Sequence, residues 1–353
     1  MNVAPLYLST VGLACPVGLT APSACAAIRA RINRFQESRY LDSEGEPIVC
    51  SELTRLPANL PPHERVQLLL GMAVTEAAQG FDGATLARIP LLVGTREPER
   101  PGDLSELLPE FLARMQAQHG LSLGATHSRA FPQGKTGGLR ALAEARVLLL
   151  REPRLPGCLV AGVDSLINAP TLWWLNSQNR LKRSGQSDGV IPGEAAGCVL
   201  VTRQPLGPSL PVMVEGLGFA QEVATLDADE PLRATGLTRA ARVALAEASL
   251  DMADIDFRIS DASGEGYYFK EVALALARTL RVNKEAIPLW LPAESLGEIG
   301  AASAVVSLIT ATVAMRRGYA PGPRAIGYAA GHQTDRAAFV LHAHSMQARR
   351  SRA

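Results

Sequence analysis

Apolar and polar positions along this chain alternate between helical and strand periods, which predicts a repeated succession of strands and helices. Residues 63–78 place apolar side chains at helical spacing, whereas residues 89–95 form the short continuous apolar run that is typical of a buried strand. Residues 157–165 and 193–203 have the same strand character. Prolines and glycines then gather in residues 205–211, and this turn-rich neck indicates a boundary about half-way along the chain.

The second half of the chain repeats this pattern. Residues 235–250 predict an amphipathic helix, and residues 299–318 predict a helix that is apolar on all sides because both of its faces are covered. Two related βα halves with such central helices favour a layered α/β fold with α-β-α-β-α architecture. We therefore expect a first half at residues 1–205, a second half at residues 206–345 and a disordered basic tail at residues 346–353.

Composition and charge narrow the function classes. The chain has 353 residues, of which 47% are apolar, and its formal net charge of +1 does not indicate a nucleic-acid partner. It shows neither a basic, apolar leader nor an apolar run long enough for a membrane helix, so we expect a cytoplasmic protein without membrane contact. The five cysteines are scattered without a CxxC pair, which favours buried, reduced thiols.

The histidines give little sign of a metal site. His342 and His344 are the only pair of histidines at a spacing that resembles that of zinc ligands. We interpret them as side chains at the end of a strand. We therefore expect neither a metal nor a cofactor.

Four motifs follow one another in a characteristic order. Residues 9–18 (STVGLACPVG) combine an opening strand with a turn, and residues 161–181 join a strand to a following helix. Residues 187–203 contain the strand entry Gly-Glu-Ala-Ala-Gly, and residues 326–341 contain a glycine-bearing loop and a last strand. In this order, the motifs resemble those of the β-ketoacyl synthases of the thiolase-like superfamily over nearly the whole chain. The resemblance implies the thiolase-like fold, with the layered architecture already expected.

In that family, a cysteine at the N-terminus of a central helix accepts the acyl group. The helix dipole and the terminal amides stabilise its thiolate and the oxyanion that forms on attack. In this sequence, Lys135 stands at the position of the cysteine, and small residues follow from Thr136 onward. Tyr328 stands at the aromatic position of the late loop, which continues to His332. The resemblance makes Lys135, Thr136, Tyr328 and His332 candidates for the former active-site pocket.

Two histidines from loops of the second half complete the chemistry of the family. The first histidine position falls on Ser260 or Ala262, and the second falls on Gly297 or Glu298. We take Ala262 and Glu298 as the degenerate positions that accompany Lys135. Because all three catalytic positions are replaced, the resemblance implies a pseudoenzyme that keeps the synthase scaffold and does not perform Claisen condensation.

Two roles are open for Lys135. A helix N-terminus favours the neutral amine, so a buried lysine there could act as a nucleophile and form a Schiff base. Alternatively, Glu265 and Glu298 lie in loops that are expected to converge on this point, and an ion pair between lysine and a carboxylate would fill the vacated pocket. We favour the ion pair because the sequence offers no clear general base for a nucleophile.

Two further features suggest contact surfaces. Trp173 and Trp174 begin an otherwise polar helix and are candidates for a protein interface, because aromatic side chains anchor such contacts. The alternative is that one of them packs inward. Residues 96–134 correspond to the region that helps to form the dimer and the acyl tunnel in the family, so they are a candidate interface or insertion. A homodimer is the default expectation from the resemblance.

Three functions are compatible with this resemblance. The first is a non-catalytic adaptor or co-chaperone in type VI secretion effector loading, with an effector or a chaperone as its partner. The alternative is a non-catalytic partner subunit of a fatty-acid or polyketide synthase, similar to a chain-length factor, that meets an active synthase and an acyl carrier protein. An adaptor predicts a filled channel at Lys135, and a partner subunit predicts an open apolar one. A weaker third hypothesis is an enzyme that uses Lys135 in unrelated chemistry.

Overall fold

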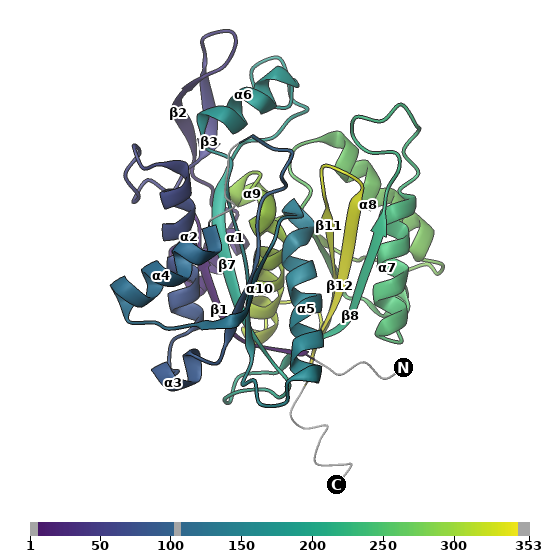
Figure 1. The fold of residues 1–353 in the computed structure, drawn as a ribbon. Coiled ribbons are helices and arrows are strands. Elements are labelled where there is room, and N and C mark those ends of the chain that lie inside the picture. Colours follow the sequence, from purple (N-terminus) through teal and green to yellow (C-terminus); the bar gives the residue numbers. More distant parts are fainter. Residues whose placement is uncertain (1–5, 102–106, 345–353) are drawn as a thin grey trace.

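The computed structural model describes residues 6–101 and 107–344, and Figure 1 shows its layered arrangement of helices and strands. In this part of the chain, ten strands form one continuous sheet. In spatial order they are β10 (Leu289–Trp290), β9 (Phe257–Ser260), β11 (Arg324–Ala330), β12 (Asp335–Ala343), β8 (Val212–Gln221), β1 (Leu6–Ala14), β7 (Glu194–Thr202), β6 (Cys158–Ser165), β4 (Pro90–Gly94) and β5 (Gly124–Phe131). The basic tail expected at 346–353 lies outside the described residues, as do residues 102–106 of the region 96–134.

The sheet consists of two five-stranded parts that meet at a narrow seam. Strands β1, β4, β5, β6 and β7 come from the first half of the chain, and the other five come from the second half. The seam is the pairing of β1 with β8, which joins Leu6 to Val214 and Tyr7 to Met213. The connection between β7 and β8 contains the proline- and glycine-rich neck at residues 205–211.

The helices complete the layers on either side of the sheet. They are α1 (Ala21–Arg29), α2 (Pro62–Ala77), α3 (Gly83–Leu86), α4 (Leu107–His119), α5 (Gly137–Arg151), α6 (Ala169–Ser177), α7 (Thr235–Glu247), α8 (Gly266–Thr279), α9 (Ala293–Leu296) and α10 (Ser303–Arg316). A separate hairpin pairs β2 (Phe35–Leu41) with β3 (Pro47–Ser51). Figure 1 shows α5 and α10 in the middle of the molecule, with α2 and α4 toward one side and α7 and α8 toward the other.

Three buried clusters confirm the expected α-β-α-β-α layering. The central cluster contains side chains of α1, α5 and α10 together with residues of both five-stranded parts. A second cluster packs α2 and α4 on the outer face of the first part, and a third packs α7 and α8 on the outer face of the second part. The two parts of the sheet therefore separate three layers of helices.

Helix α10 belongs to the second half of the chain and packs against both halves. It is buried along almost its whole length and packs on strands from both parts of the sheet. This placement explains why the sequence is apolar on all sides there. Despite this apolar character, no helix among the described residues is both long enough and apolar enough to span a membrane.

The late segment differs from the expectation of a glycine-bearing loop. Strand β11 continues through Ala330, so only residues 331–334 connect it to β12. Along β11 the side chains alternate: Ala325 and Ala329 face the central layer, whereas Ile326 and Tyr328 pack in the outer layer with α7 and α8. Tyr328 is therefore turned away from the central layer, and its expected place in the former pocket is wrong. Alternation along an extended strand is the physical reason.

Close packing at the start of α5 makes a glycine pair a test of the layered core. A Cβ added to Gly137 would lie 2.5 Å from the carbonyl oxygen of Phe131, whereas a Cβ at Gly83 would meet nothing within 4 Å. Both glycines occupy the first residue of a helix. We expect Gly137→Ala to lower the free energy of unfolding by about 1–3 kcal/mol, because the backbone must move apart.

The matched control is Gly83→Ala, which should stabilise the protein by about 0.4–1 kcal/mol through the lower entropy of the unfolded chain. Urea unfolding of both variants measures the difference. A gain in stability for Gly137→Ala would contradict the close approach of α5 to its neighbours.

Candidate functional site

The chain turns sharply just before α5 and presents one side chain at the tip of the turn. Residues Gly134–Thr136 form a short 3-10 turn that leads directly into α5. Gly134 adopts the left-handed conformation with φ of 52°, and a Cβ there would lie 2.7 Å from a carboxylate oxygen of Glu97. Glycine is favoured at such a position because it has no side chain to clash. The next residue is Lys135, so it lies at the start of the central helix, where the motif resemblance placed it.

Lys135 reaches from the first half of the chain to two carboxylates of the second half. Its Nζ lies 2.6 Å from Oε2 of Glu298 and 3.9 Å from Oδ2 of Asp261. The same ammonium donates a hydrogen bond of 3.3 Å to the main-chain carbonyl of Asp261 and lies 4.8 Å from the centroid of the Tyr268 ring. The side chain is 10% exposed. The predicted ion pair between Lys135 and Glu298 is therefore confirmed.

Both carboxylates are held by further hydrogen bonds. Glu298 accepts the main-chain N–H of Gly300 at 2.8 Å and the hydroxyl of Ser263. Asp261 accepts the main-chain N–H of Ala330 at 2.8 Å. These donors orient the carboxylates independently of Lys135. The cluster is therefore a set of oriented charges inside the protein.

The electrostatics of the cluster favour a charged lysine. Burial disfavours the ammonium, but the carboxylates of Glu298 and Asp261 outweigh it and raise the pKa of Lys135 above its ordinary value. Burial likewise disfavours the carboxylate of Glu298, yet Lys135 and Ser263 outweigh it and lower the pKa of that carboxyl. Burial raises the pKa of Asp261, which lies farther from the ammonium. A nucleophilic lysine needs a neutral amine, so this arrangement favours the ion pair over Schiff-base chemistry.

A cavity of about 310 Å³ opens beside Lys135. Its wall carries many charged side chains: Glu97, Glu99, Arg100, Lys135, Arg180, Glu298 and Asp335. Among the described residues that line it there is one histidine, His332, and no cysteine. The cavity is open, which differs from the filled channel expected for an adaptor, and its wall combines apolar with charged side chains, whereas a purely apolar channel was expected for a partner subunit.

A second ion pair separates Glu265 from Lys135. Two of the three guanidinium nitrogens of Arg180, Nε and Nη2, donate to the Glu265 carboxylate at 2.7 and 2.9 Å, and the third, Nη1, lies 2.9 Å from Nδ1 of His332. The expectation that Glu265 could pair with Lys135 is therefore wrong. The planar guanidinium matches a carboxylate bidentately, and this geometry explains why Glu265 pairs with the arginine.

The remaining predicted residues lie around this centre. Thr136 is buried and its hydroxyl donates to the Gln133 carbonyl at 3.1 Å, while Ala262 is buried in the loop between Asp261 and Ser263. Trp174 packs edge-on against His332, with ring centroids 5.4 Å apart. Trp173 is 70% exposed, so the two tryptophans divide between inward packing and the surface.

The sequence did not single out Asp261, Arg180, Tyr268 or Arg100. Arg100 is 2% exposed and forms a buried ion pair with Asp164 of β6. The start of the region 96–134 therefore builds part of the cavity wall instead of forming a free insertion. The proline-rich context of Arg100 (EPERPG) is a signal that could have pointed to this residue, whereas Arg180 lies in a polar stretch (NSQNRLKR) that gives no such signal.

The chain is similar in sequence and in fold to proteins of polyketide synthesis. No family model matches the chain. The tetracenomycin polyketide synthase ketoacyl synthase beta subunit of Streptomyces glaucescens is 26% identical over 287 residues, which are 76% of this chain and 68% of that protein. The solved complex of a type II polyketide acyl-carrier protein with its ketosynthase bound to the hexaketide has a TM-score of 0.77 at 13% identity, covering 97% of this chain and 100% of that chain.

A ketosynthase in complex with its chain length factor from Xenorhabdus doucetiae has a TM-score of 0.69 at 15% identity, covering 97% of this chain and 98% of that one. The chain thus has the thiolase-like fold of the ketosynthases. Its relatives and structural neighbours are ketosynthase and chain-length-factor proteins of polyketide synthesis.

A double-mutant cycle tests the ion pair at the centre of the site. We expect Lys135→Met and Glu298→Gln each to cost about 3–5 kcal/mol, because each leaves a buried charge without its partner. The double variant should lose less than the sum, by about 0.5–3 kcal/mol. Urea unfolding gives the four free energies.

The exposed pair Arg129 and Glu144, with 3.9 Å between its charged atoms, is the control. The corresponding cycle there should give a coupling of about 0–1 kcal/mol. Strictly additive losses at Lys135 and Glu298 would contradict a direct buried interaction.

The lowered pKa of Glu298 predicts a pH dependence of stability. A carboxyl with a folded-state pKa below its ordinary 4.5 stabilises the fold fully above that pH, and this contribution is lost as the pH falls through the folded pKa. The difference in unfolding free energy between the wild type and Glu298→Gln should therefore be constant near neutral pH and shrink below about pH 4.5. Unfolding curves at a series of pH values measure it, with Glu144→Gln as the baseline, and a difference that grows on acidification would disprove the assignment.

Proposed function

We propose that this chain is a non-catalytic ketosynthase-like subunit that pairs with an active ketosynthase of polyketide or fatty-acid synthesis, in the manner of a chain-length factor. The observation that carries the proposal is the buried cluster of Lys135, Glu298 and Asp261 at the start of α5. The similarity to a ketoacyl synthase beta subunit supports the proposed class of partner.

The charges of the cluster oppose decarboxylative condensation. That reaction needs a thiolate to accept the acyl group and hydrogen-bond donors to stabilise the enolate. The position before α5 instead carries an ammonium whose pKa is raised, so it holds no lone pair for attack. A developing enolate would also lie in the field of the Glu298 and Asp261 carboxylates, which destabilises negative charge.

The edge of the sheet at β5 offers a surface for the partner. Among the strands of residues 6–101 and 107–344, β5 pairs only with β4, and its other side therefore presents main-chain groups that no described strand pairs with. Its residues Ala125, Thr126 and Ala130 are exposed. Helix α5 packs beside this strand and exposes the apolar side chains of Val147 and Leu150. An unpaired edge next to exposed apolar side chains fits the pairing of two related subunits.

The comparisons favour this proposal over the other hypotheses. The relatives and neighbours described above belong to polyketide synthesis, and they lend no support to a role in type VI secretion. An enzyme that uses Lys135 as a nucleophile is disfavoured by the raised pKa of its ammonium.

Reconstitution with an active ketosynthase of the same organism and its acyl carrier protein tests the proposal. The chain alone should not decarboxylate a malonyl-loaded carrier, and it should form a stable complex with the ketosynthase that supports chain extension. Ala130→Lys should weaken this complex at least tenfold, because a charged side chain on the edge strand opposes pairing. Size-exclusion chromatography and product analysis measure both outcomes.

The matched control is Ala26→Lys, which places the same side chain at an exposed position of α1 and should leave the complex intact. Malonyl turnover by the chain alone would contradict the non-catalytic assignment. A stable complex with a secretion effector or chaperone, together with no binding to the ketosynthase, would refute the proposed partner.

A further inference from the structure

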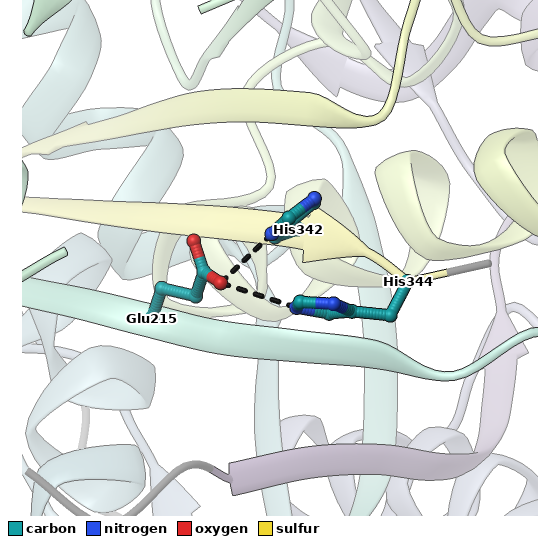
Figure 2. A group of neighbouring side chains, drawn as sticks. All are labelled: Glu215, His342 and His344. Atoms are coloured by element: carbon teal, nitrogen blue, oxygen red, sulfur yellow. Dashed lines mark hydrogen bonds and ion pairs between the residues drawn. The ribbon is translucent and has the colours of Figure 1, made fainter. Parts of the chain in front are cut away.

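Two histidines and a glutamate meet at the end of the sheet that lies far from Lys135. Figure 2 shows His342 on β12 and His344 directly after this strand, with their rings turned toward Glu215 on the neighbouring strand β8. Nδ1 of His342 lies 2.8 Å from Oε1 of Glu215, and Nε2 of His344 lies 3.2 Å from the same oxygen. The potential ligand atoms all lie within 4.8 Å of one another.

The backbone aims these three side chains at one point. His342 is the penultimate residue of β12, and His344 continues the chain directly after the strand, where both rings reach the same Glu215 oxygen. On β8 the register with β12 shifts by one residue, because Gly216 pairs with Val340 and Val214 pairs with Leu341. Glu215 is the extra residue of this bulge. A bulge redirects side chains, and this one sets the Glu215 carboxylate beside the two imidazoles.

We propose that Glu215, His342 and His344 form a binding site for a divalent transition-metal ion, with zinc as the best match. Zinc prefers imidazole nitrogen and carboxylate oxygen at about 2.0–2.2 Å in tetrahedral geometry, which sets ligand atoms about 3.4 Å apart. The separations of 2.8 and 3.2 Å to Oε1 lie close to that value, and the separation between the two imidazole nitrogens, which is within 4.8 Å, would contract on binding. Each imidazole would bind in its neutral form, with its proton on the other ring nitrogen.

The surroundings leave one coordination position of the site open to solvent. The side chains of His342 and Glu215 are 17% and 19% exposed, and His344 is 41% exposed, so water can fill the fourth position. The last turn of α7 packs on Gly216 beside the site, and the carbonyl end of a helix favours a cation. Arg324 opposes this effect, because it pairs with His342 across β11 and β12.

The site is independent of the cavity and of the proposed function. Asp335 of β12 lines the cavity, and His342 follows it seven residues later. At about 3.4 Å per residue, the two ends of the strand are about 24 Å apart. Bound zinc would tie the end of β12 to β8, next to the narrow seam between β8 and β1.

Zinc titration of the untagged, full-length chain tests the site. Equilibrium dialysis and calorimetry with zinc chloride should give one equivalent per chain. Glu215→Gln, His342→Ala and His344→Ala should each weaken binding at least tenfold, because even the loss of a group that only supports a ligand costs 10–100-fold. The control His63→Ala removes an exposed histidine on α2 and should leave the affinity unchanged.

A second measurement separates loss of the site from loss of the fold. Cobalt(II) should give the visible absorption of a tetrahedral complex with the wild type, and this band should vanish in the three variants while their circular dichroism stays that of a folded chain. Magnesium should not compete, because it prefers oxygen ligands in octahedral geometry. Failure of zinc to bind, or binding that all three variants retain, would overturn the proposal and leave a hydrogen-bonded cluster at the strand end.

Discussion

The buried contact between the Lys135 ammonium and the Glu298 carboxylate ties together the two halves of this chain. It joins the start of α5, in the first half, to the loop after α9, in the second half. Neither charge can leave the site alone, since an unpaired ion inside a protein is costly. The main-chain N–H of Gly300 orients the Glu298 carboxylate, and the main-chain N–H of Ala330 orients the second carboxylate, Asp261.

The contact between Lys135 and Glu298 matters because few other features of the described chain hold the two parts of the sheet together. Within the described residues, the two parts of the sheet pair with each other only where β1 meets β8, at Leu6 and Tyr7. Most of what holds them in register is the central layer, where α10 packs on strands of both parts. Close approach of α5 to β4 at Gly94 and Gly137 brings Lys135 within reach of the opposite loops.

The sequence predicted what depends on local pattern. Apolar periodicity gave the layered fold, and the small residues after Lys135 gave the turn and helix that present it. The pairing of Lys135 with Glu298 was also predictable, because both positions follow from aligned motifs. The role of Arg180 was not, since it depends on a long connection that brings residue 180 next to residue 265. Tyr328 was misplaced because a glycine-bearing segment looked like a loop, although it continues as a strand.

The two carboxylates around Lys135 also restrict how this site could change during evolution. A cysteine substituted for Lys135 would place its thiol beside Glu298 and Asp261, and like charges nearby raise the pKa of a thiol. The thiolate that condensation needs would then be disfavoured at the one position built to present it. Replacing either carboxylate first would leave the lysine partly unpaired. The path to a reactive site therefore passes through less stable intermediates. The present set of charges thus hinders the evolution of a cysteine nucleophile at position 135.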